Sequence, residues 1–430
     1  MQKLTELLSS LAGGALDSRL VSIYGPQGLS YARERALRVA RGFAERFAAG
    51  DGKRSVLLAS APGRAELGGN HTDHQRGRVL CASIGLDALA CAGANGLGLI
   101  RLYSEGYGEL CVDTAALSAP VDAERGHTAA LVRGVAAGIA ARGFRVSGFD
   151  AYVASDVLSG SGLSSSAAFE VLLGCVMNAL FCGGAIPPLE LAAIGQAAEN
   201  VYFGKPCGLL DQTACSLGGV SAIDFAAPGH PQVEPIACDF ERSGHSLCIV
   251  DTGSCHDDLT AEYAAIPDEC RAVAAHFGAD ALRGVDPAAF SAEIPALRRS
   301  LGDRAVLRAM HFFAENERVS RQAAALRAGD FAAFLALVNE SGRSSAELLE
   351  NLWAGNAREQ PIPLALALAR DALGGAGACR VHGGGFAGTI AAFVPHGLLG
   401  SFTARLEAVF GPGSCHVLRV RPEGGAIIDC

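Results

Sequence analysis

The sequence predicts an α+β protein of two domains, and three observations lead to that prediction. The chain has 430 residues, which is long for a single hydrophobic core. Half of its residues are hydrophobic and only 18% are charged, a composition typical of a well-buried globular protein. Segments with strand patterns and segments with helix patterns are mixed along the chain without a regular alternation. An α+β arrangement is therefore favoured over a doubly wound sheet or a barrel.

The first half of the chain begins with apolar residues at helical spacing, followed by short strand-like runs that are separated by Gly and Asn turns. In order, the pattern predicts a helix at 31–48, strands at 56–60, 79–93, 96–104 and 109–113, a helix near 127–142, a strand at 149–155, a long helix starting near Ser164 and a helix at 189–203. The predicted strands are therefore concentrated between residues 56 and 113.

A boundary between the two domains is expected near residue 235. The segment 226–235, AAPGHPQVEP, is the stretch richest in Pro and Gly, which is typical of a linker. We therefore expect an N-terminal domain at 1–235 and a C-terminal domain at 236–430. The second half is expected to contain a strand at 246–252, several helices between 258 and 373, a glycine-rich stretch at 379–394, a helix near 398–410 and a strand at 415–422.

Charge and cysteine usage exclude several classes of protein. The net charge is −9 and no dense Lys/Arg run is present, which disfavours a nucleic-acid or anionic-membrane partner. We see no signal-peptide pattern, and no apolar stretch reaches the roughly 18 residues of a membrane helix. The fourteen cysteines are scattered without a CxxC pair, as in reduced core thiols. We expect a cytoplasmic protein that is a monomer or a weak homo-oligomer.

The stretch 63–77, GRAELGGNHTDHQRG, is unusually polar for a segment that follows an apolar strand. His71, Asp73 and His74 have a spacing that suggests a metal site, but the other nine histidines form no matching cluster. Carboxylate, amide and imidazole groups together can instead pair with several hydroxyls in a fixed pattern. The stretch therefore favours a pocket for a sugar-like molecule over a metal site or a merely polar turn.

A second signal is a glycine- and serine-rich loop between a strand and an apolar helix. It consists of Gly160, Ser161, Gly162, Leu163, Ser164, Ser165 and Ser166. Backbone N–H groups of such a loop and the positive end of the helix form a cradle for phosphate. The loop lacks the features of a Walker A loop, a dinucleotide fingerprint and a hydrolase elbow. The alternative is a Ser N-cap after a flexible turn.

Two further stretches carry weaker signals. In 197–219, Glu199 lies near the end of a helix and Asp211 near the start of another. Asp211 is either an N-cap or a catalytic base or metal ligand, and the residues alone do not decide between them. In 380–395, three glycines separate two strand-like segments. They form either a bulged hairpin or a turn that packs against another glycine loop or a nucleotide.

In combination, these stretches resemble the GHMP kinase family and, within it, the galactokinases. Residues 63–77 are similar to the galactokinase signature, 160–167 to the phosphate loop, 207–212 to the segment with the catalytic aspartate, and 383–388 to the third glycine motif. A weaker similarity covers 251–270, where His256, Tyr263 and Cys270 match. The resemblance spans about residues 55 to 390.

The resemblance implies an ATP-dependent sugar 1-kinase, with galactose as the sugar, and two α+β domains that flank the active site. Asp211 would be the general base, and Arg64 would stabilise its anion and the transferred phosphoryl group. Ser166, or its neighbour Ser165, and Glu199 would hold Mg²⁺. The loop 160–166 would bind ATP. The sugar contacts implied are Arg64, Asn70, His71, Asp73, Gly208, Asp211 and Tyr263.

The chain departs from the galactokinase pattern at several positions. It has Asn70 where the family carries the Glu thought to contact a distal sugar hydroxyl, Glu66 where the family carries Asn, and His74 where it carries Tyr. Ile266 and Pro267 replace an arginine pair, and 341–355 also differs. A GHMP kinase for another sugar and a non-catalytic sugar and nucleotide sensor are the alternatives. A dinucleotide-dependent oxidoreductase is excluded because its fingerprint is missing.

Overall fold

The computed structural model describes residues 1–48, 50–157, 162–205, 207–253, 259–355 and 357–429. Two β-sheets organise these residues, and the larger one has nine strands. Its strands are β1 (Gln2–Lys3), β2 (Ser55–Gly68), β3 (Arg78–Ala94), β4 (Leu99–Ser104), β5 (Gly108–Asp113), β6 (Phe149–Ser155), β7 (Val220–Asp224), β8 (Gln232–Ile236) and β13 (Ala426–Ile428). The order is β1-β2-β3-β6-β4-β5, with β13 beside β2 and the β7–β8 pair beside β3.

The smaller sheet belongs to the second half of the chain. Its strands are β9 (His245–Asp251), β10 (Ala378–His382), β11 (Thr389–Pro395) and β12 (Cys415–Leu418). They are antiparallel in the order β10-β11-β9-β12. The turn between β10 and β11 contains the third glycine motif, so this motif lies at one end of the smaller sheet.

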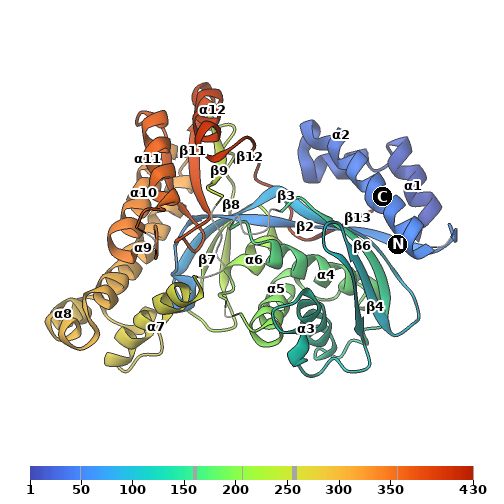
Figure 1. Cartoon of the computed structure of the whole chain (residues 1–430), viewed down its shortest axis with the longest axis horizontal. Coiled ribbons are helices and arrows are strands. Elements are labelled where there is room, and N and C mark those ends of the chain that lie inside the picture. The colour runs from blue at the N-terminus through green and yellow to red at the C-terminus, as the bar shows by residue number, and fades with distance from the viewer. Residues whose placement is uncertain (49, 158–161, 206, 254–258, 356, 430) are drawn as a thin grey trace.

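Helices cover both sheets. The first half contains α1 (Leu4–Gly13), α2 (Asp17–Phe43), α3 (Thr128–Ala140), α4 (Ser165–Phe181), α5 (Pro188–Ala197), α6 (Leu210–Leu217) and the wider helical turns η1 (Ala44–Ala48) and η4 (Ala198–Phe203). The second half contains α7 (Thr260–His276), α8 (Pro287–Leu301), α9 (Asp303–Arg327), α10 (Phe331–Ser344), the wider turn η6 (Ser345–Leu349), α11 (Pro361–Leu373) and α12 (Leu399–Phe410). In Figure 1, α3 to α6 lie below the larger sheet, and α1 and α2 lie at its outer end.

The two long strands β2 and β3 connect the parts of the molecule. In Figure 1 they run from the N-terminal helices toward the second half of the chain. Every residue of β2 except Ser55 is buried, which explains its long apolar pattern. The two chain ends meet on this strand, because β1 and β13 both pair with β2.

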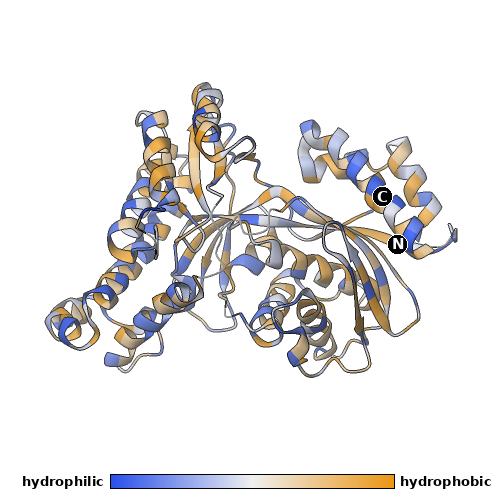
Figure 2. Cartoon of the chain, in the orientation of Figure 1, coloured by the Kyte–Doolittle hydropathy of each residue, from blue (hydrophilic) through white to orange (hydrophobic). Residues whose placement is uncertain are grey.

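One hydrophobic core extends across both sheets. It includes Leu57 and Phe149 of the larger sheet together with Phe334 and Phe393 of the second half. The rings of Phe334 and Phe393 lie edge to face with centroids 5.1 Å apart, a favourable aromatic geometry. Figure 2 shows hydrophobic residues along the strands and on the helices that pack against them. The two halves are therefore joined by buried apolar surface.

Most of the expected elements are present, and the differences have local causes. The strand expected at 149–155 is β6, and the helix expected near 127–142 is α3. The strand expected at 56–60 was too short, because β2 continues to Gly68 and carries Arg64 and Glu66. The short elements α1, β8 and β13 were missed. The domain boundary near 235 remains a prediction. Strand β8 belongs to the larger sheet and β9 to the smaller one.

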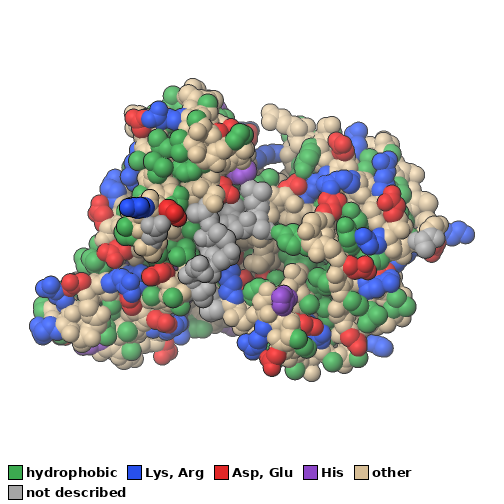
Figure 3. All heavy atoms as spheres, viewed as in Figure 1, with side chains coloured by type: hydrophobic (Ala, Val, Ile, Leu, Met, Phe, Trp, Pro, Cys, Tyr) green, Lys and Arg blue, Asp and Glu red, His purple; other side chains and the backbone are tan. Residues whose placement is uncertain are grey.

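Within the described ranges, no helix is both long and apolar enough to cross a bilayer. On the face seen in Figure 3, acidic and basic side chains are interspersed and neither sign forms a continuous patch.

Candidate active site

The centre of the candidate site is an ion pair between β2 and the first turn of α6. Arg64 donates from Nε to Oδ1 of Asp211 over 2.7 Å and from Nη2 to Oδ2 over 2.8 Å. The Arg64 side chain is 7% exposed, whereas that of Asp211 is 33% exposed. A bidentate pair of this kind fixes the orientation of both groups. The carboxylate is therefore held rigidly but remains accessible.

The electrostatics of this pair keep Asp211 ionised. Burial acts to raise its pKa, but the charge and hydrogen bonds of Arg64 and the hydroxyl of Ser164 outweigh burial and lower the pKa below its ordinary value. Ser164 donates to Oδ2, which also accepts from Arg64. Among the described residues only Arg64 donates to Oδ1. Because a carboxylate oxygen has two acceptor sites, Oδ1 can accept a further proton donor.

The described part of the glycine- and serine-rich loop, residues 162–166, lies directly beside this pair. The backbone N–H of Arg64 donates to the carbonyl of Leu163 over 3.1 Å, and its guanidinium donates to the carbonyl of Gly162. Ser164 has a φ of 60°, so the chain turns sharply before α4 begins at Ser165. Gly160 and Ser161 lie outside the described residues. The described part of the loop thus places the N-terminus of α4 next to Asp211.

The third glycine motif packs against the same loop. A Cβ on Gly162 would lie 3.1 Å from Oγ1 of Thr389 and 3.4 Å from Nδ1 of His382. A Cβ on Gly383 would lie 3.6 Å from the carbonyl oxygen of Gly162. Gly162 and Gly383 have φ values of 71° and 68°, a conformation that favours glycine on both sides of the contact. The contact agrees with the interpretation that this turn packs against another glycine loop.

Ser166 and Glu199 face each other as the resemblance implied for metal ligands. Ser166 Oγ donates to Oε1 of Glu199 over 3.2 Å, and Glu199 is 4% exposed. Ser165 is the first residue of α4. Within the described chain, no group of three or more His, Cys, Asp or Glu side chains is arranged to hold a metal ion. One hydroxyl and one carboxylate do fit Mg²⁺, which takes few protein ligands and completes its shell with phosphates and water.

The residues expected to hold the sugar contact two segments, the one that precedes Asp211 and the third glycine motif. A Cβ on Gly208 would lie 1.6 Å from Oδ2 of Asp73, so Gly208 allows Asp73 to approach. Burial lowers the pKa of His71 to about 4, and its Nε2 lies 2.9 Å from the Gly384 carbonyl. Because a carbonyl only accepts, Nε2 carries the proton of a neutral ring. Tyr263 donates its hydroxyl to the Gly385 carbonyl over 2.7 Å.

Two family models match the chain over the segments that form this site. "GHMP kinases N terminal domain" matches residues 130–219, and "Galactokinase galactose-binding signature" matches residues 41–94. A galactokinase of Streptomyces coelicolor is 34% identical over 366 residues, which cover 84% of this chain and 90% of the relative. The chain belongs to the galactokinase family. A galactokinase of Actinobacillus pleuropneumoniae is 32% identical over 357 residues, covering 82% of this chain and 89% of the relative.

Solved structures agree with this family assignment. The galactokinase of Lactococcus lactis in complex with galactose matches with a TM-score of 0.76 and 26% identity, covering 90% of this chain and 98% of that one. A mevalonate kinase matches with a TM-score of 0.61 and 13% identity, covering 85% of this chain and all of the other, a likeness of fold alone. The expected α+β fold of the GHMP kinase type is thereby confirmed.

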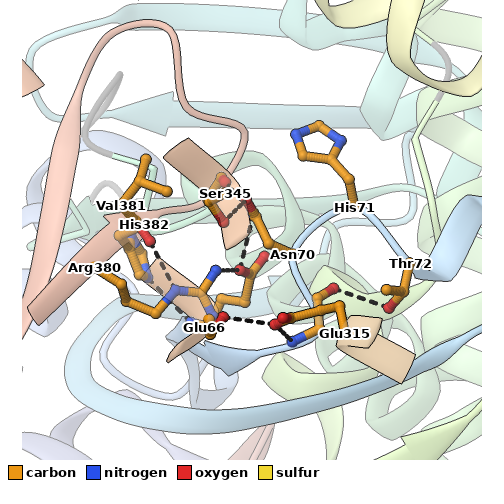
Figure 4. Close-up of polar contacts among 12 residues, drawn as sticks. Glu66, Asn70, His71, Thr72, Glu315, Ser345, Arg380, Val381 and His382 are labelled. Carbon is orange, nitrogen blue, oxygen red and sulfur yellow. Dashed lines mark hydrogen bonds and ion pairs between the residues drawn. The ribbon is translucent and has the colours of Figure 1, made fainter. Parts of the chain in front are cut away.

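Two of the departures from the galactokinase pattern, Asn70 and Glu66, meet in one buried network with residues of the divergent segment 341–355 (Figure 4). Asn70 is 0% exposed, and its Nδ2 donates to Oε1 of Glu66 over 3.0 Å and to the Gly383 carbonyl over 2.7 Å. Its Oδ1 accepts from Ser345 over 3.1 Å and from Asn351 over 2.9 Å. The structure therefore places the Asn70 amide among protein groups, and its predicted sugar contact remains untested.

Glu66 is held in the same network by an arginine from the smaller sheet. Arg380 on β10 donates from Nη2 to Oε1 of Glu66 over 2.7 Å. The backbone N–H of Glu66 donates to Nε2 of His382 over 3.0 Å. Sequence reasoning missed Arg380 as a partner of the signature. Its position three residues before Gly383, the first residue of the third glycine motif, was the available signal.

A second buried carboxylate supports the loop that contains Asn70. Oε1 of Glu315 on α9 accepts from the backbone N–H of Gly69 over 2.9 Å and from Ser341 over 2.6 Å.

The charged groups around Glu315 keep it ionised. Although burial acts to raise its pKa, the charges of His311, Arg380 and Arg318 lower the pKa of Glu315 to about 2. Nε2 of His311 lies 2.9 Å from the Asn70 carbonyl. Helix α9 thus fixes the backbone of the signature, another role that the sequence did not reveal.

Proposed function

We propose that this protein transfers the γ-phosphate of ATP to the anomeric hydroxyl of galactose. The observation that carries the proposal is the Arg64–Asp211 pair, which also contacts Gly162 and Ser164 of the glycine- and serine-rich loop. Membership of the galactokinase family, with relatives named galactokinase over most of the chain, supplies the reaction. ATP use follows from the kinase family.

Asp211 is proposed as the general base. The sugar hydroxyl donates a hydrogen bond to Oδ1, the oxygen with a remaining acceptor site, and its proton passes to the carboxylate as the oxygen bonds to the γ-phosphorus. The bond from phosphorus to the β–γ bridging oxygen breaks, and ADP leaves. A base with a lowered pKa suits a loose transition state, in which positioning and charge matter more than early proton removal.

Arg64 is proposed to act in two ways. Its bidentate contact orients Asp211 and keeps it ionised. Its charge lies beside the Gly162 carbonyl and the start of α4, where backbone N–H groups and the helix dipole also favour anions. Charge that develops on the phosphoryl oxygens would therefore be stabilised by groups already in place.

Mg²⁺ is proposed to be held by Ser166 and Glu199, because a hydroxyl and a buried carboxylate 3.2 Å apart are oxygen donors of the kind it prefers. When bound, the ion would neutralise charge on the ATP phosphates. Sugar contacts are proposed for His71, Asp73, Gly208 and Tyr263. For Asn70 the buried amide supports a positioning role, in which it sets the shape of the signature rather than touching the sugar.

A coupled assay for ADP with a panel of monosaccharides tests the proposal. Galactose is expected to drive ADP formation well above the sugar-free background, and removal of Mg²⁺ by EDTA should abolish it. Failure of every sugar to stimulate ADP formation would refute a sugar kinase and favour the non-catalytic sensor.

A second candidate is a kinase for a different sugar. The family carries Asn at position 66 and Glu at position 70, whereas this chain has Glu66 and Asn70. This exchange favours the second candidate, because it moves a negative charge within the sugar signature. The same panel decides: a higher kcat/KM for another hexose or derivative than for galactose would select this candidate.

A further inference from the structure

The predicted metal ligand Glu199 already has a cation beside it. Lys205 places Nζ 3.3 Å from Oε1 of Glu199, the same oxygen that accepts from Ser166 over 3.2 Å. The Glu199 side chain is 5% exposed, whereas that of Lys205 is 65% exposed. The buried carboxylate is therefore fixed, and the lysine reaches it from the solvent side.

The backbone holds Lys205 in this place. The wider turn η4 ends at Phe203 and is capped by Gly204, which has a φ of 90°, a conformation that favours glycine. The N–H groups of Gly204 and Lys205 donate to the carbonyl of Glu199 itself over 3.0 Å and 3.1 Å. The lysine six residues after the glutamate is thereby folded back onto it, outside the usual helical spacing of three or four.

The other oxygen of Glu199 is also engaged, but by a neutral group. Nε2 of Gln212 donates to Oε2 of Glu199 over 3.0 Å and to Oε2 of Glu170 over 3.0 Å. Gln212 is fully buried and adjoins Asp211 in the sequence. Because Gln212 orients Oε2 toward the core, Oε1 is the oxygen that faces both Ser166 and Lys205. A metal ion held by Ser166 and Glu199 would need this oxygen.

We propose that Lys205 is a built-in counter-ion of the metal site: it occupies the cation position at Glu199 in the nucleotide-free enzyme and is displaced when the divalent metal binds. The inference rests on the proposed function only through the assignment of Ser166 and Glu199 as metal ligands. Two cations cannot share Oε1 without repulsion. A long exposed side chain can leave at low cost, and a divalent ion attracts the carboxylate more strongly than an ammonium.

Lys205 therefore performs two tasks. It keeps the buried Glu199 carboxylate compensated when no metal is present, since an unpaired buried charge is costly. It also weakens metal binding before the nucleotide arrives, because the metal must compete with a tethered cation. The phosphates of the nucleotide then add ligands to the metal, so that the metal binds more strongly and displaces Lys205.

The test is the affinity of the nucleotide-free protein for Mn²⁺, a paramagnetic substitute for Mg²⁺ whose free concentration is read by electron paramagnetic resonance. Lys205→Met is expected to bind Mn²⁺ about three- to tenfold more tightly than the unchanged protein, as expected for removal of a partly exposed competing charge. Lys205→Arg should remain close to the unchanged protein. Lys53→Met, which removes an exposed lysine elsewhere, is the matched control for net charge.

The outcomes separate this inference from the proposed function. Equal or weaker Mn²⁺ binding by Lys205→Met, or an equal gain in Lys53→Met, overturns the counter-ion role. Absence of binding in all variants, or binding that Glu199→Gln does not reduce, overturns it as well. The sugar panel is scored separately, so that a tighter site without sugar phosphorylation refutes only the proposed reaction. Thermal unfolding of each variant verifies that it is folded.

Discussion

Strand β2 carries residues of two arginine–carboxylate pairs that differ in how exposed the carboxylate is. Arg64 and Glu66 are two residues apart and therefore lie on the same face of the strand. Arg64 pairs with Asp211 of α6, whose side chain is 33% exposed. Glu66 pairs with Arg380 of β10, and these side chains are 8% and 1% exposed. The same chemistry thus occurs once at an accessible surface and once in the interior.

The difference separates a reactive pair from a structural one. In the first pair, Oδ1 of Asp211 keeps an acceptor site that a substrate hydroxyl can use. In the second, Oε1 of Glu66 accepts from both Arg380 and Asn70. A buried pair of this kind contributes little net stability but is costly to break, so it specifies which elements meet. Here it connects the larger sheet to the smaller one beside the site.

The largest expected effect is at the accessible pair. Asp211→Asn should lower kcat by about 10²- to 10⁴-fold, because the amide cannot accept the hydroxyl proton. Galactose binding, measured by titration calorimetry, should change far less. Asp17→Asn, which alters an aspartate of similar exposure paired with Arg33, is the control and should keep its turnover. Unchanged turnover in Asp211→Asn would remove this residue from the mechanism.

Variants of the buried Glu66–Arg380 pair should change the free energy of unfolding rather than the rate of catalysis. Glu66→Asn leaves Arg380 without its carboxylate and should lower the free energy of unfolding by about 3–5 kcal/mol. Asn70→Glu should also destabilise, because it places a carboxylate where the amide now lies 3.0 Å from Oε1 of Glu66. Urea denaturation followed by circular dichroism measures both.

The double variant Glu66→Asn/Asn70→Glu sharpens this prediction. It restores one carboxylate and one amide in the network, so it should recover about half or more of the summed loss, a coupling expected for residues in contact. Strictly additive losses would show that the two positions do not act as a unit. The sugar panel on the double variant then reports whether the exchange changes the preferred hexose.

A smaller effect, on the KM for galactose, is expected at the contact between Asp73 and Gly208. Gly208→Ala introduces a Cβ that would lie 1.6 Å from Oδ2 of Asp73, so the carboxylate must move. The KM for galactose should rise about ten- to hundredfold, with less change in kcat. Gly400→Ala, where a Cβ meets nothing within 4 Å, is the control. Equal KM values in both variants would mean that Asp73 does not hold the sugar.

The last expected effect is a pH dependence of the free energy of unfolding. Burial lowers the pKa of His71 from 6.5 to about 4, so between these values the unfolded chain binds the proton that the folded protein rejects. The stability that His71 contributes therefore rises with pH from about 4 to 6.5 and is lost on acidification. His71→Gln should reduce this slope by up to about 1.4 kcal/mol per pH unit, measured by urea titrations at several pH values. Exposed His230→Gln should leave the slope intact.

Local sequence was sufficient for much of the fold and for naming the residues expected at the site, whose roles remain predictions. Strand β6 and helix α3 were found because their apolar periodicity is strong. The short strand β13 was missed because three residues contain too little pattern. Strand β2 was cut short because Arg64 and Glu66 looked like the start of a loop, yet both are buried in the strand by partners from elsewhere.

The sequence alone determined which groups this protein brings to its site, since motifs with glycines, serines and acids at fixed spacing carry their chemistry locally. Only the tertiary structure decided how they are paired. Arg380 lies 314 residues after Glu66, and Arg64 lies 147 residues before Asp211. No local periodicity records such separations, because the packing of distant elements sets them. Packing also decides which carboxylate remains accessible to a substrate and which is closed.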